Sequence, residues 1–93
     1  MPTATMLGEQ WRLDGSVALR PEPFGALAYH FGTRKLSFLK TPELVDVVRR
    51  LQDSPSVEDA LRRAGVPEPH WTAYVGALQG LAAGGMIQRR DPA

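Results

Sequence analysis

The residues best suited to chemistry in this sequence are two histidines, His30 and His70, because the chain contains no cysteine. The absence of thiols excludes disulfides, thiolate zinc sites, cysteine nucleophiles and cysteine-ligated iron–sulfur clusters. Neither histidine has a serine or carboxylate in a known nucleophile motif, and the two are not at the spacing of paired metal ligands. The sequence therefore predicts a protein that is not an enzyme and has no metal site and no cofactor. Both histidines are expected in structural or surface roles.

Arginine pairs are the other candidates, here for binding an acidic partner. They stand at Arg49–Arg50, Arg62–Arg63 and Arg89–Arg90. Asp46, Glu58 and Asp59 each precede one of these arginines by four residues, the spacing of helical ion pairs on a solvated face. The sequence leaves two interpretations open, a solvated face or a docking site, and the last pair is the least neutralised.

The composition predicts one small globular domain. A chain of 93 residues has room for one modest core, and 43% hydrophobic with 23% charged residues is typical of a folded protein. The formal net charge of +1 argues against a dedicated nucleic-acid binder. No signal-like segment is evident, and no apolar run approaches the roughly 18 residues of a membrane span. We expect a cytoplasmic domain over residues 11–89, a flexible arm over 1–10, a tail over 90–93, and neither nucleic acid nor membrane as partner.

Alternating apolar residues predict strands in the first half of the chain. Residues 11–19 read as one strand region interrupted by the turn pair Asp14–Gly15 and ended by Pro21 and Pro23. Residues 25–31 alternate with a period of two, a glycine-containing turn follows at 32–34, and residues 35–40 return as a second strand. This hairpin is the most regular strand signal in the sequence.

Helix signals follow the hairpin directly. Thr41 can cap a helix that begins with Pro42, and Ser56 can cap a second one, with Asp59 three residues later. A third helix is expected over residues 69–83, ended by Gly84–Gly85. Met86 to Gln88 can add a short extended piece. The order predicts an α+β fold, a three-stranded antiparallel sheet followed by three helices, similar to a winged helix-turn-helix.

The third predicted helix is a poor DNA-recognition helix. Residues 68–84 contain no arginine or lysine, the side chains that such a helix presents to phosphates and bases. One face is an apolar stripe that includes Trp71, Tyr74, Val75 and Leu78. The opposite face carries only small residues, namely Ala73, Gly76, Ala77, Gly80 and Ala83. Such a face allows close packing within the domain or forms the floor of a groove for a partner.

The returning strand of the hairpin is expected at a sheet edge, because the chain leaves it directly for a helix. An edge strand offers unpaired N–H and C=O groups. Lys35 and Lys40, at its two ends, either protect this edge from uncontrolled pairing or frame a site for an added peptide strand.

The segment from Arg20 to Lys40, RPEPFGALAYHFGTRKLSFLK, resembles the mycofactocin precursor-peptide chaperones, members of the PqqD-like group of peptide recognition elements. The segment from Ser56 to Leu61 is similar to the second helix of that group, and Leu78, Leu81, Gly85 and Met86 are similar to the end of its third helix. The resemblance extends from about Trp11 to Gln88. It depends mainly on the hairpin, because the helical matches are weak by themselves.

The resemblance implies a peptide-binding site. Members of this group bind the leader of a ribosomally made precursor peptide as an extra strand, beside the third strand and against the third helix. Here the pairing strand would be Lys35, Leu36, Ser37, Phe38, Leu39 and Lys40, and the candidate groove-lining residues are Trp71, Tyr74, Val75 and Leu78. The implied partner is a radical S-adenosylmethionine (SAM) maturase that carries the iron–sulfur chemistry.

Two alternatives are a winged-helix nucleic-acid-binding domain and an adaptor that binds only the enzyme. Proline at Ser37 or Leu39 is expected to abolish peptide binding if the N–H of that residue pairs with the peptide.

Overall fold

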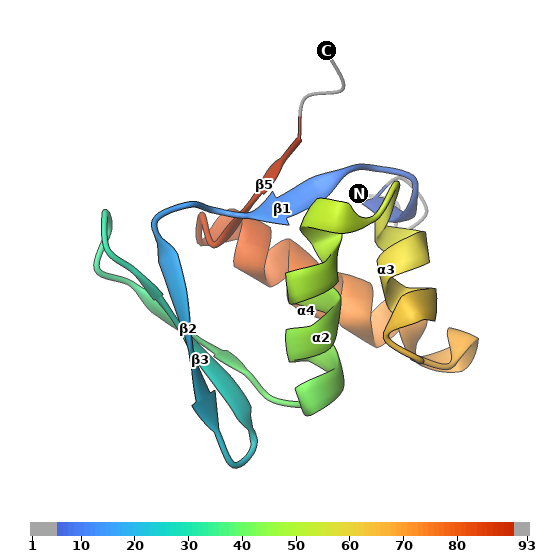
Figure 1. The fold of residues 1–93 in the computed structure, drawn as a ribbon, viewed down its shortest axis with the longest axis horizontal. Helices are drawn as coiled ribbons and strands as arrows, with labels where there is room; N and C mark the ends of the chain where they lie inside the picture. The colour runs from blue at the N-terminus through green and yellow to red at the C-terminus, as the bar shows by residue number, and fades with distance from the viewer. Residues whose placement is uncertain (1–5, 91–93) are drawn as a thin grey trace.

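Three antiparallel strands and three helices form the body of the domain. In the computed structural model, which describes residues 6–90, strands β2 (Val17–Glu22), β3 (Gly25–His30) and β4 (Leu36–Leu39) form one sheet in that order. Helices α2 (Pro42–Arg50), α3 (Val57–Arg63) and α4 (Trp71–Ala83) follow and lie to one side of the sheet (Figure 1). Short 3-10 turns, Leu51–Asp53 and Glu68–His70, connect the helices. The predicted α+β class, with a three-stranded antiparallel sheet followed by three helices, is confirmed.

A second, two-stranded sheet joins the beginning and the end of the described chain. Strand β1 (Trp11–Leu13) pairs antiparallel with β5 (Ile87–Arg89), and Trp11 lies opposite Arg89. The expected single strand region over residues 11–19 is therefore two strands in two different sheets. The Asp14–Gly15 turn separates them, and the Asp14 carboxylate fixes this turn by accepting the Ser16 N–H at 2.7 Å.

Strand β2 continues through Pro21 to Glu22, although the sequence predicts that Pro21 ends it. Pro21 lies opposite Ala26, and β2 is an edge of the sheet. Proline is tolerated in a strand where its missing N–H would face solvent rather than a neighbouring strand. The edge position of β2 explains the difference.

The core lies between the inner face of the sheet and the helices. Ala26, Ala28 and Leu39 point inward from the sheet, and each is at most 1% exposed. Together with buried residues of the helices they form one continuous apolar cluster. Its helical members include Val47, Val48, Leu61, Val75 and Leu78. No helix within residues 6–90 is long and apolar enough to cross a membrane.

Residues 6–10 are packed against the domain, unlike the flexible arm expected over 1–10. Met6 belongs to the core, and the Glu9 carbonyl accepts the Val57 N–H at 3.0 Å. At the other end, Arg90 donates through its side chain to the carbonyls of Gln52 and Ser54. The rest of the expected arm, 1–5, and of the expected tail, 91–93, lies outside the described residues.

Candidate functional site

Among residues 6–90, no strand pairs with the outer side of β4, as expected for the returning strand of the hairpin. The His30 N–H donates to the Lys35 carbonyl at 3.0 Å, so these two residues form a hydrogen-bonded pair of the β3–β4 ladder. Such pairs alternate along an antiparallel ladder. The backbone groups of Ser37 and Leu39 therefore face β3, and those of Leu36 and Phe38 face outward. Proline at Ser37 or Leu39 would break the hairpin itself, so the proline experiment belongs at Leu36 or Phe38.

Helix α4 turns the apolar stripe predicted to line a groove toward the core. Val75 and Leu78 are fully buried, and Trp71 is 8% exposed with its indole N–H donating to the Val66 carbonyl at 2.9 Å. These three residues lie in the core, and the structure does not bring them into the groove predicted for them. Their burial has a simple cause, because the apolar stripe of an amphipathic helix packs against the core. Of the four candidates on this helix, only the half-buried Tyr74 borders open space.

The opposite face of α4, made of small residues, is exposed. Ala73, Gly76, Ala77, Gly80 and Ala83 all lie on this face. A Cβ atom placed on Gly76 or Gly80 would have no atom within 4 Å outside the helix's own backbone. Glycine inside a helix destabilises it by about 1 kcal/mol relative to alanine, usually for a packing reason. The domain itself supplies no such reason at these two positions, so close packing within the domain does not explain them.

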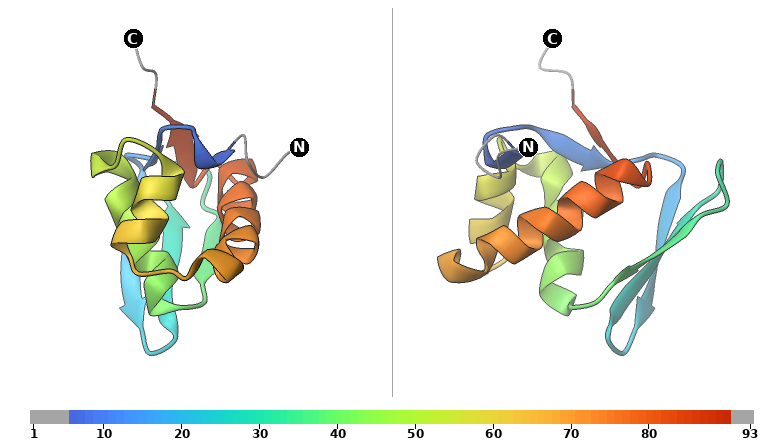
Figure 2. Two further views of the ribbon diagram at one scale, coloured as in Figure 1. Left: turned by 90° about the vertical axis from the view of Figure 1, so that its right-hand side faces the viewer. Right: turned by 180° about the vertical axis from the view of Figure 1, so that it is seen from behind.

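A groove runs between β4 and the small face of α4. Its larger part has a volume of about 370 Å³, and a smaller part of about 170 Å³ adjoins it through Lys40, Leu44 and Ala77. We call the two together the β4–α4 groove. In the left view of Figure 2, β4 is the strand of its sheet nearest to α4. The larger part is lined by Ser37, Phe38, Lys40, Leu44, Ala77, Gly80 and Leu81, and the smaller part by Lys40, Thr41, Leu44, Ala73, Tyr74 and Ala77.

One hydrogen bond holds the two walls of this groove together at the end where β4 meets α2. The Tyr74 hydroxyl lies 3.1 Å from the Thr41 Oγ1 atom, which also accepts the Leu44 N–H at 3.0 Å. Thr41 is thus the predicted cap of α2 and also the anchor for α4. This contact connects the two walls at that end of the groove.

Lys35 and Lys40 lie at the ends of β4, as predicted. Within residues 6–90, neither lysine has a carboxylate at ion-pair distance. The helical arginines differ, since Arg50, Arg62 and Arg63 pair with the three predicted acids at 2.7–3.0 Å. These arginines form a solvated face with neutralised charge. Arg34, in the turn of the hairpin, likewise has no ion pair among residues 6–90, as is also true of Arg12 and Arg49 elsewhere on the surface.

The histidines take no part in this groove. His30 is 9% exposed, and its Nδ1 atom accepts the N–H groups of Gly32 at 3.0 Å and Thr33 at 3.1 Å. It therefore organises the turn between β3 and β4. His70 is exposed at the start of α4. In the part of the chain that the structure describes, no three His, Asp or Glu side chains gather in a way that could hold a metal ion.

Comparison with known proteins gives one consistent result. The model of the peptide chaperone MftB family matches residues 10–88. The protein named peptide chaperone MftB in Mycobacterium ulcerans is 56% identical over 83% of this chain and 71% of its own length. The protein of the same name in Mycobacterium tuberculosis is 52% identical over 87% of this chain and 74% of its own length. The one in Mycolicibacterium smegmatis is 51% identical over 88% of this chain and 80% of its own length. No solved structure gives a significant match.

Proposed function

Because this chain belongs to the peptide chaperone MftB family, we propose that it binds the leader of the mycofactocin precursor peptide by strand addition and presents it to a radical SAM maturase. A peptide chaperone has no catalytic role, which agrees with the prediction that the chain is not an enzyme. The peptide is added as a strand along the outward side of β4, within the β4–α4 groove. The iron–sulfur chemistry resides in the maturase, and binding takes place in the cytoplasm.

The observation that carries this proposal is an unpaired strand edge facing an exposed helix face of small residues. Leu36 and Phe38 each direct one N–H and one C=O outward, so up to four backbone hydrogen bonds are offered to an added strand. Each is worth about 0.5–1.5 kcal/mol net. Ala77 and Gly80 leave room for peptide side chains on the facing side. Micromolar affinity corresponds to about −8 kcal/mol, which backbone pairing and one or two apolar anchors can provide.

The exposed glycines of α4 support the same location. A helix gains stability when an exposed interior glycine becomes alanine, so two such glycines without internal packing indicate that space above the helix is needed. An extended peptide fills this space, because its backbone must come close to the helix while it pairs with β4. Lys35 and Lys40 at the two ends of the strand suit carboxylates in the leader.

An NMR titration with a synthetic leader peptide tests the proposal. We expect the amides of Leu36 and Phe38 to show the largest shifts on the strand, together with those of Ala77 and Gly80 on α4. The amides of Ser37 and Leu39 shift less, because they remain bonded to β3. Saturable shifts confined to residues outside the groove, such as those of α3, would show that the peptide binds elsewhere.

A further inference from the structure

A second exposed apolar surface lies on the face of the sheet that points away from the helices. Phe31, Leu36 and Phe38 are 59–64% exposed, and Phe24 is 41% exposed. Leu27 and Tyr29 on β3 are half-buried between them. We call Phe24, Leu27, Tyr29, Phe31, Leu36 and Phe38 the outer-face patch. Contiguous apolar surface of this kind is uncommon on a small domain and marks an interaction site.

The register of the strands separates this patch from the core. Leu27 lies opposite Phe38 and Tyr29 lies opposite Leu36, so these four side chains share one face of the sheet. Their neighbours along the strands, such as Ala28 and Leu39, point into the core. The patch therefore contributes nothing to the main core, and folding alone does not require its large side chains.

The patch is hollowed and its aromatic side chains are already arranged. Ala18, Arg20, Leu27, Tyr29 and Leu36 line a depression of about 420 Å³. Tyr29 and Phe31 pack edge to face with ring centroids 5.0 Å apart, and Phe24 lies 6.0 Å from Phe38. Aromatic side chains held in this way lose little conformational entropy on binding. This hollow has mostly apolar walls, and one of them is Tyr29, held against Phe31, so it suits a protruding apolar side chain of a folded partner.

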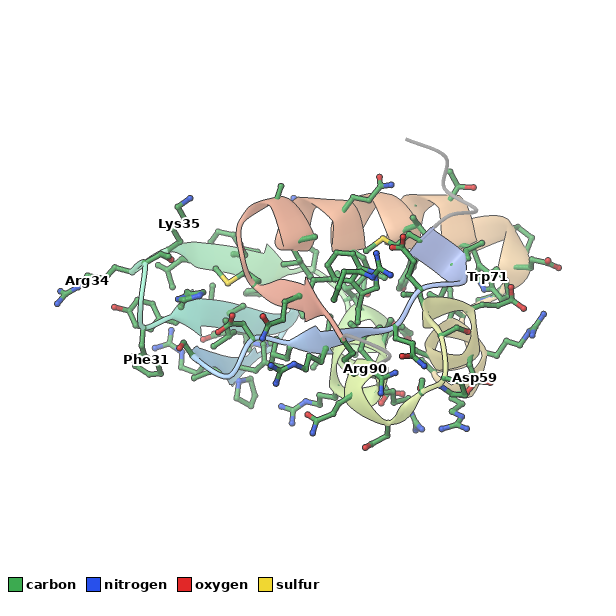
Figure 3. The ribbon with its side chains drawn as sticks, turned by 90° about the horizontal axis from the view of Figure 1, so that it is seen from above. Phe31, Arg34, Lys35, Asp59, Trp71 and Arg90 are labelled. Carbon is green, nitrogen blue, oxygen red and sulfur yellow. The ribbon has the colours of Figure 1, made fainter. Side chains whose placement is uncertain are left out.

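The charges around the patch indicate what surrounds that protruding side chain. Arg34 and Lys35 lie in the β3–β4 turn beside Phe31, at the end of the molecule away from Trp71 and Asp59 (Figure 3). Neither has a carboxylate at ion-pair distance among residues 6–90. A second copy of this chain would bring its own unpaired cations to a symmetric contact, where they repel. A partner with carboxylates around an apolar protrusion complements the patch.

We propose that the outer-face patch docks a folded protein that inserts an apolar side chain ringed by carboxylates. This inference rests on the proposed function, in which that protein is the maturase. The peptide occupies the outward side of β4 and the enzyme covers the face of the sheet, so both bind the same hairpin at the same time. The chaperone then holds the peptide beside the enzyme rather than releasing it first.

Binding of the purified maturase and of the synthetic leader to the full chain and two double variants tests this assignment. In the first, Phe31→Ser is combined with Phe24→Ser, both at exposed positions outside the β4–α4 groove, so the fold is retained. In the second, Arg34→Glu is combined with Arg20→Glu, because Arg20 lines the depression and lies outside the β4–α4 groove. Arg12→Glu with Arg49→Glu is the matched control, because it changes the charge equally at exposed sites outside the patch.

Each patch variant is expected to weaken maturase binding by about 10-fold or more, as removal of central interface residues does. The control binds the maturase normally, and all variants bind the leader with unchanged affinity.

Three outcomes would overturn the inference. Both patch variants could bind the maturase as tightly as the unchanged chain. The unchanged chain could bind the leader but not the maturase. Sedimentation could show a dimer of the unchanged chain that the patch variants convert to monomer, which would make the patch a self-association surface. Failure of the proposed peptide site is distinguishable, since it abolishes leader binding in the unchanged chain and leaves the maturase measurements intact.

Discussion

Gly80 on α4 offers a test in which stability and binding change in opposite directions. It lies on the exposed face of the helix, lines the larger part of the β4–α4 groove, and has open space where a side chain would begin. Replacing it by leucine removes the helix penalty of glycine, a gain of about 0.7 kcal/mol. For a domain of this size that gain raises the Tm by about 3–6 °C. The new side chain fills the groove, and we expect leader binding to weaken by about 10-fold or more, or at least about 1.4 kcal/mol.

Gly76→Leu is the matched control. Gly76 lies one helical turn earlier on the same exposed face and has equal open space, but it is not among the residues lining either part of the groove. We expect it to raise the Tm by a similar amount and to leave leader affinity nearly unchanged.

Thermal unfolding followed by circular dichroism and titration calorimetry with the synthetic leader give the two readouts. Equal leader affinity for Gly80→Leu and Gly76→Leu would refute the placement of the peptide against α4. A lower Tm for Gly80→Leu would refute the claim that the space above this helix is open.

Three further substitutions test the strand edge and the frame around it. Phe38→Pro removes an outward N–H, and we expect leader binding about 2- to 12-fold weaker than for Phe38→Ala, which keeps that N–H, by calorimetry of the folded variants. Gly25→Ala places a Cβ 2.1 Å from the Leu39 carbonyl oxygen and should destabilise the domain by at least about 2 kcal/mol in urea unfolding. Gly15→Ala, with no atom nearby, should change stability by less than about 0.5 kcal/mol. Thr41→Ala loses both the cap of α2 and the Tyr74 contact, and it should lower the free energy of unfolding in urea by about 1–2 kcal/mol. Thr41→Ser keeps the hydroxyl and should retain most of this stability.

The elements predicted well from the sequence are those set by local signals. The β3–β4 hairpin forms as expected, and both helix caps act as predicted, with Ser56 accepting the Asp59 N–H at 3.2 Å and Thr41 accepting that of Leu44. The pairing of β1 with β5 was not predictable in this way. It joins segments at opposite ends of the chain, and three-residue strands carry too little periodicity to identify a partner.

The candidate site was only partly predictable. Trp71, Val75 and Leu78 attract attention because they are large, but large apolar side chains at helical spacing mark the core. The informative residues were the small ones, since Gly76 and Gly80 would not be retained in an exposed helix without a reason. Which amides of β4 face outward depends on the register across the β3–β4 turn. That register is fixed by the His30–Lys35 pair, which composition and periodicity do not reveal.

Along β4, the outward-facing backbone groups of a residue and its side chain belong to two different surfaces of the domain. At Leu36 the amide and carbonyl belong to the edge proposed to bind the peptide, and the side chain belongs to the opposite face of the sheet. Backbone groups are the same in almost every amino acid, so mutation at this position alters the side-chain surface and leaves the hydrogen-bonding edge in place. With the peptide on this edge and the enzyme on the outer face, as proposed, side-chain changes that follow sequence drift in the enzyme would leave peptide binding intact. For engineering, the same separation allows the outer face to be redesigned for a different enzyme while the leader stays constant.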